Sequence, residues 1–121
     1  MKKLLFLAVF PLFAFQCSEN NDANLSDELT EKKQEIVDYI NSFDCTESCS
    51  YIAFGSKPCG GPREYLLFSS NVNLGQLQQM VAEYNEMDHQ NNIQTNAISD
   101  CAVELPPNAV DCVNGDCVVI N

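Results

Sequence analysis

Seven cysteines constrain this 121-residue chain more than any other feature of its sequence. A short chain with so many thiols is typical of exported proteins, in which disulfides supplement a small hydrophobic core. An odd number leaves one cysteine without a partner, so one of the seven needs a different role. The seven are Cys17, Cys45, Cys49, Cys59, Cys101, Cys112 and Cys117.

The first sixteen residues predict export. Lys2 and Lys3 precede an apolar run over residues 4–15, the charged and apolar regions of a secretory signal peptide. The run is shorter than the roughly 20 residues that a membrane-spanning helix needs. We therefore predict a signal peptide over residues 1–16, which leaves a mature chain of 105 residues, enough for one small domain.

The surroundings of Cys17 suggest a role for the odd cysteine. The segment Phe-Ala-Phe-Gln-Cys-Ser-Glu-Asn-Asn-Asp, residues 13–22, resembles the end of a bacterial lipoprotein signal, with Ala14 and Gln16 in place of its usual Leu and small residue. The resemblance implies that Cys17 is the first mature residue, carries lipid, and anchors the protein in the bacterial cell envelope, at the outer membrane. The acidic stretch that follows leaves a surface-facing orientation open. The alternative is a soluble secreted protein with Cys17 free or mispaired.

With Cys17 lipidated, the six remaining cysteines favour three disulfides, among fifteen possible pairings that the sequence leaves open. Metal binding is the competing use of cysteine. However, the chain has no C-x2-C pair, and His89 is its only histidine. We therefore expect neither a metal nor a cofactor.

Net charge excludes two classes of partner. The mature chain has four bases and seventeen acids, a net charge of −13. Such a chain has too few cations to neutralise a phosphate backbone, so nucleic-acid binding is excluded. Electrostatic adhesion to anionic lipid is excluded for the same reason. The membrane contact that we predict is made by the lipid on Cys17 alone.

Apolar spacing predicts two helices in a single domain over residues 26–121, after a polar tether over residues 17–25. The first helix should begin at a Ser26 cap and end near Phe43. Asn71 or Asn73 should cap the second, which should end near residue 91, before an exit loop.

Short aromatic and branched runs predict strands over residues 50–54 and 64–69, joined by a turn-rich loop at residues 55–62. Alternation predicts another strand over residues 101–105. Asn114-Gly115 is a strong signal for a two-residue hairpin.

In that hairpin Cys112 faces Cys117. Two arrangements are therefore possible: a disulfide between these two cysteines, or a separate disulfide from each of them to another element. The expected fold is α+β: two helices packed on a small antiparallel sheet of four to five short strands, stapled by three disulfides.

One long segment also supports a family resemblance. Ile-Ala-Phe-Gly-Ser-Lys-Pro-Cys-Gly-Gly-Pro-Arg-Glu-Tyr-Leu, residues 52–66, is followed by Ser-Asp-Cys at 99–101 and Gly-Asp-Cys at 115–117. This pattern is similar to a family of small, uncharacterised bacterial exported proteins and lipoproteins, over about residues 49–117. The resemblance implies an exported domain with disulfides, and it implies no activity and no bridge pairing.

The sequence predicts a protein that is not an enzyme. His89 stands among polar residues, as a solvated surface residue would, and six paired cysteines leave no nucleophilic thiolate. Glu83, Glu86 and Asp88 have the spacing expected of a solvated helix face. No pair of these acids stands out as a catalytic pair.

The 55–62 loop is the most distinctive candidate surface. Its glycines allow close backbone approach, its prolines stiffen it, and a disulfide at its centre would preorganise it for binding. The candidate binding residues are Lys57, Gly60, Gly61 and Arg63. The simpler interpretation is that glycine and proline only turn the chain. We predict an envelope protein with a binding or structural role; the alternative is a secreted or surface protease inhibitor acting through this loop.

Overall fold

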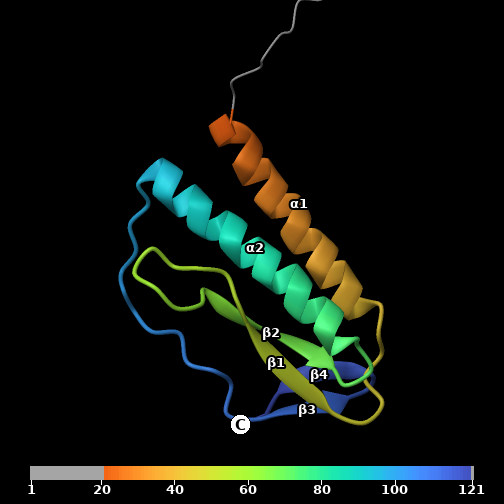
Figure 1. Cartoon of the computed structure of the whole chain (residues 1–121). Helices are drawn as coiled ribbons and strands as arrows, with labels where there is room; N and C mark the ends of the chain where they lie inside the picture. Colours follow the sequence, from red (N-terminus) through yellow and green to blue (C-terminus); the bar gives the residue numbers. More distant parts are fainter. Residues whose placement is uncertain (1–20, 121) are drawn as a thin grey trace, which may run out of the picture.

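In the computed structural model, which describes residues 21–120, two helices lie side by side over one β-hairpin, and a second hairpin packs against the first (Figure 1). The predicted signal peptide and the predicted lipidation of Cys17 lie outside the described residues. No helix in the part of the chain that the structure describes is long and apolar enough to cross a membrane.

The first helix, α1 (Asn21–Asn41), begins five residues before the predicted cap at Ser26. The last five residues of the segment predicted as a tether are therefore helical. The sequence has no proline or glycine between Asn21 and Ser26, so nothing stops the helix from extending toward the N-terminus.

The second helix, α2 (Leu74–Thr95), begins where its cap was predicted. The Asn73 side chain accepts a hydrogen bond from the Gln76 N–H at 3.1 Å. The prediction that the chain leaves the helix near residue 91 is wrong, because α2 continues to Thr95. It ends at Asn96, which adopts a left-handed conformation with φ of 49°.

The core lies between the helices and the first hairpin. Strand β1 (Cys49–Phe54) pairs antiparallel with β2 (Glu64–Ser69), with Ile52 opposite Leu66. Every second residue faces the helices, as the period of a strand requires. The buried core consists of Leu29, Ile36, Ile40, Phe54, Phe68, Val72, Leu77, Val81 and Tyr84.

The second hairpin consists of β3 (Val110–Val113) and β4 (Asp116–Val119). Asn114 and Gly115 both have positive φ, 52° and 84°, which confirms the predicted two-residue turn. The fold is α+β, but its four strands form two separate two-stranded sheets. The single sheet of four to five strands was therefore a wrong prediction.

The predicted strand over residues 101–105 is absent from the structure. Its alternating residues are exposed on both sides, and no neighbouring strand supplies hydrogen bonds. Cys101 has a left-handed φ of 56°, and the Ala102 N–H donates to the Asp100 carboxylate at 3.0 Å. The alternation of apolar and polar residues does not produce a strand here, because the backbone N–H and C=O groups of a strand need hydrogen-bond partners on a neighbouring strand.

Three disulfides join the elements, as predicted: Cys45–Cys112, Cys49–Cys117 and Cys59–Cys101. Cys112 and Cys117 face each other across the hairpin, but each bonds to the chain at or before the start of β1. The structure thus selects the second of the two arrangements that the sequence left open.

Candidate functional site

The 55–62 loop lies against the chain that follows α2. We call residues 97–109 the exit segment; Figure 1 shows it passing beside the loop. The Cys59–Cys101 disulfide joins the two, and a cleft of about 370 Å³ lies between residues 59–62 and 101–104. The candidate loop and the exit segment therefore form one surface.

Lys57 holds this surface together. Its side chain is only 10% exposed, and Nζ donates to the Ala102 carbonyl at 2.8 Å and to Glu104 Oε1 at 3.3 Å. Asp100 lies 3.7 Å away, and its pKa is lowered first by the hydrogen bond from the Ala102 N–H and then by the charge of Lys57. Lys57 is therefore not a free recognition residue.

Gly60 and Gly61 are exposed and have φ of 97° and 83°. The Gly60 N–H donates to the Lys57 carbonyl, and the Lys57 N–H donates to the Gly61 carbonyl, both at 2.9 Å. Backbone conformation accounts for both glycines, because residues with a Cβ rarely adopt such φ values. At these two positions the simpler interpretation of the loop is sufficient.

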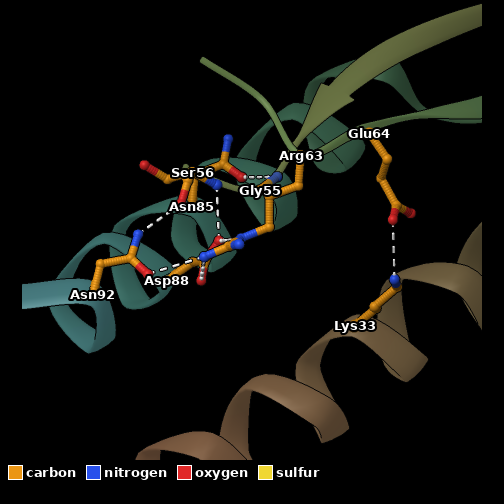
Figure 2. Close-up of polar contacts among 8 residues, drawn as sticks. All are labelled: Lys33, Gly55, Ser56, Arg63, Glu64, Asn85, Asp88 and Asn92. Carbon is orange, nitrogen blue, oxygen red and sulfur yellow. Dashed lines mark hydrogen bonds and ion pairs between the residues drawn. The ribbon is translucent and has the colours of Figure 1, made fainter. Parts of the chain in front are cut away.

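Arg63 binds a carboxylate that the sequence analysis assigned to solvent. Its Nε donates to Asp88 Oδ2 at 2.7 Å and its Nη2 donates to Asp88 Oδ1 at 3.2 Å (Figure 2). The Asp88 hydrogen bond raises the pKa of Arg63. The Asp88 side chain is only 6% exposed. The prediction that Asp88 lies on a solvated face is therefore wrong.

Two asparagines extend this ion pair into a network that holds the loop backbone. Asn85 Oδ1 accepts from the Gly55 N–H at 2.8 Å, and Asp88 Oδ2 accepts from the Ser56 N–H at 2.8 Å. Asn92 accepts from Arg63 Nη2 at 2.9 Å and donates to the Ser56 carbonyl at 2.7 Å. All of these groups point into the space between α2 and the start of the loop (Figure 2).

The other two acids behave as predicted. Glu83 and Glu86 are exposed. Glu83 pairs with Lys32 of α1 at 2.8 Å, and this hydrogen bond lowers the pKa of Glu83. His89 is also exposed, as expected for a surface residue.

Three aliphatic side chains of the exit segment are almost fully exposed. Ile98 is 95% exposed, Val103 81% and Leu105 80%, and we call this set the apolar exit surface. This surface was not predicted from the sequence, because the alternation around Val103 and Leu105 indicated a strand. One sequence signal against a strand was available: Pro106-Pro107 follows the alternating residues directly. Two prolines limit backbone pairing with a neighbouring strand.

Comparisons of the chain with protein-family models, with curated proteins and with solved structures found no match. The function is therefore inferred from the chain's own geometry.

We expect Lys57→Met to loosen the exit segment while leaving the core intact. Methionine keeps most of the aliphatic side chain but cannot donate to Ala102 or pair with Glu104. The loss of this partly buried, charge-assisted bond should cost about 1–3 kcal/mol. Hydrogen exchange at the Ala102 amide should accelerate. Lys33→Met is the control, because Lys33 pairs with Glu64 at 3.3 Å, outside the site. Equal exchange in both variants would refute the role of Lys57.

Proposed function

We propose that this chain is a lipid-anchored, non-enzymatic binding protein of a bacterial envelope, and that it contacts a protein partner through the apolar exit surface. The observation that carries the proposal is the near-complete exposure of Ile98, Val103 and Leu105. The three side chains lie within eight residues of the sequence, and burial of each one against a partner is favourable by about 1.5–3 kcal/mol.

The attachment of the exit segment favours binding over chance exposure. Three contacts hold the exit segment at successive residues. Cys101 bonds to Cys59, and the Ala102 carbonyl accepts a hydrogen bond from Lys57. The Glu104 carbonyl accepts one from the Tyr65 hydroxyl at 3.4 Å. A segment fixed in this way loses little conformational entropy when a partner binds.

The charges beside the apolar exit surface favour a basic partner. Asp100 and Glu104 are both exposed and outnumber Lys57, the single cation with which they pair. The mature chain that we predict is also strongly acidic. Charged groups around an apolar contact mainly set the association rate and the choice of partner. We therefore expect a partner with an apolar pocket and basic residues around it.

The loop gives the protease-inhibitor alternative little support. A basic residue that enters a protease pocket must be free, yet Lys57 and Arg63 both bind carboxylates within this chain. We therefore do not advance inhibition as a second function.

A capture assay with matched variants tests the binding proposal. Wild type, Val103→Asp/Leu105→Asp and Leu74→Asp would be immobilised and exposed to the native envelope fraction. We expect the exit-segment variant to lose at least about 100-fold in captured partner, because it forgoes the burial of two aliphatic side chains, each favourable by about 1.5–3 kcal/mol. Leu74 is 48% exposed at the start of α2, so Leu74→Asp should bind normally. Equal capture by all three proteins would contradict the proposal.

The anchor has a separate test. We expect wild type to incorporate labelled palmitate and to partition into the detergent phase, and Cys17→Ser to do neither. Ser18→Ala should behave like wild type, because the proposed lipid is carried by Cys17 and not by Ser18. An unlabelled wild-type chain in the aqueous phase would refute lipidation and leave the binding proposal unaffected.

A further inference from the structure

The two disulfides that fasten the second hairpin bring four sulfur atoms together. Cys45 Sγ lies 3.1 Å from Cys49 Sγ, and Cys49 Sγ lies 3.5 Å from Cys112 Sγ. The sulfurs of Cys45, Cys49 and Cys117 all lie within 4.8 Å of one another. Cys112 bonds to Cys45 and Cys117 to Cys49, so the four form one cluster.

Each half of the cluster comes from a short stretch of chain. Cys45 and Cys49 are separated by three residues, and Cys112 and Cys117 by four. Both spacings occur in zinc sites, where two such pairs from different parts of the chain commonly share one ion. The lack of a C-x2-C pair therefore does not exclude a metal site, because the fold brings Cys45 and Cys49 next to Cys112 and Cys117.

Two of the sulfur separations lie near the spacing that a tetrahedral ion requires. With Zn–S bonds of about 2.3 Å, tetrahedral geometry places the sulfurs roughly 3.8 Å apart. The unbonded separations of 3.1 and 3.5 Å differ from that value by less than about 1 Å. The two bonded pairs must move apart on reduction, and Cys112 must approach the group formed by Cys45, Cys49 and Cys117. We propose that Cys45, Cys49, Cys112 and Cys117, when both disulfides are reduced, bind one soft divalent cation of the zinc class.

Two contacts support a site that forms without the disulfides. The Cys45 N–H donates to the Gly115 carbonyl at 2.9 Å, which ties the first pair to the hairpin through the backbone. In addition, Cys45 and Cys117 line a cleft of about 420 Å³, which gives a reductant or an ion a route to the sulfurs.

Reduction of each S–S bond takes two electrons and two protons and gives two thiols. A dithiol supplies both and closes into its own disulfide; a phosphine supplies the electrons, water supplies the protons, and the phosphine leaves as its oxide. Binding of Zn²⁺ releases the four thiol protons and forms four Zn–S bonds. The same sulfurs cannot be disulfides and metal ligands at once, so the two forms exclude each other.

Cobalt titration tests the site. The full chain, reduced with a phosphine, would be titrated with Co²⁺, whose tetrahedral thiolate complexes absorb in the near-ultraviolet and visible. We expect saturation at one ion per chain, displacement by Zn²⁺, and slower oxidation of the thiols when Zn²⁺ is present. Cys59→Ser/Cys101→Ser should keep the signal, and Cys49→Ser/Cys117→Ser should lose it.

Folding is followed by circular dichroism in the same samples. If the metal-free reduced wild type is folded, Zn²⁺ should raise its thermal midpoint; if it is unfolded, Zn²⁺ should restore the folded-state spectrum. The proposal is overturned if the reduced chain binds no Co²⁺ or binds at another stoichiometry. It is also overturned if the Cys49→Ser/Cys117→Ser variant keeps the signal.

Discussion

Removal of both bridges to the second hairpin should destabilise the domain by more than the sum of the two single removals. Cys45–Cys112 and Cys49–Cys117 span 67 and 68 residues, and each closes almost the same loop. While either bridge remains, the other closes only a loop of roughly ten residues, so its loss should cost about 2.5 kcal/mol. Loss of both opens the larger loop, which the remaining Cys59–Cys101 bridge shortens to roughly 26 residues, with a total cost of about 6 kcal/mol.

Urea unfolding of three alanine variants measures this difference. The variants lack the first bridge, the second, or both, and sucrose in every sample keeps the weakest one folded. The two single-bridge variants serve as controls for the loss of the cysteine side chains themselves. If the cost of losing both bridges equals the sum of the separate costs, the nested-loop explanation is wrong.

Asp88→Ala should be the most damaging substitution of a charged side chain on α2. It removes the acceptor for Arg63 Nε, Arg63 Nη2 and the Ser56 N–H. Loss of one member of a buried pair typically costs 3–5 kcal/mol. Since the Arg63 side chain is 41% exposed and can bind water, we expect about 3 kcal/mol. The thermal midpoint should then fall by more than about 10 °C.

Glu86→Ala is the matched control for this prediction. Glu86 is an acid on the same helix, but it is exposed and bonds only to Gln90 among the described residues. Its removal should change stability by less than about 0.5 kcal/mol. Asp88→Asn should fall between the two, because it keeps an oxygen for Ser56 but loses the charge. Similar midpoints for Asp88→Ala and Glu86→Ala would show that the network contributes little.

Local chemistry made parts of this fold predictable. Asn73 caps α2 because its side chain can reach the backbone three residues on. Asn114-Gly115 forms a tight turn because both residues tolerate positive φ. In each case the residues that determine the structure are adjacent in the sequence.

Long-range pairing was harder to predict. Asp88 and Asn92 continue the spacing of the buried residues Leu77, Val81 and Tyr84. The charge of Asp88 assigned it to solvent, and Asn92 was placed beyond the predicted end of the helix. Their burial depends on Arg63 and the Ser56 backbone, more than twenty residues away. The pairing of the cysteines likewise depends on where the second hairpin docks.

The strand predicted at residues 101–105 failed for a related reason. Its alternation was correct for a strand, but the disulfide at Cys101 and the Lys57 contact hold this segment beside the loop, away from either sheet. The exposed side chains that resulted became the candidate site. The alternation of polar and apolar residues over 101–105 is the same for a half-buried strand and for an exposed segment held by other contacts, so it could not distinguish the two.

Photo-cross-linking in the native cell tests the proposed binding surface most directly. A photoreactive residue would replace Val103 in one strain and Leu74 in another, since both side chains are exposed but only Val103 belongs to the apolar exit surface. We predict one dominant protein adduct from position 103, absent from position 74 and lost when Leu105→Asp is added. No adduct from position 103, or the same adducts from both positions, would contradict the proposal.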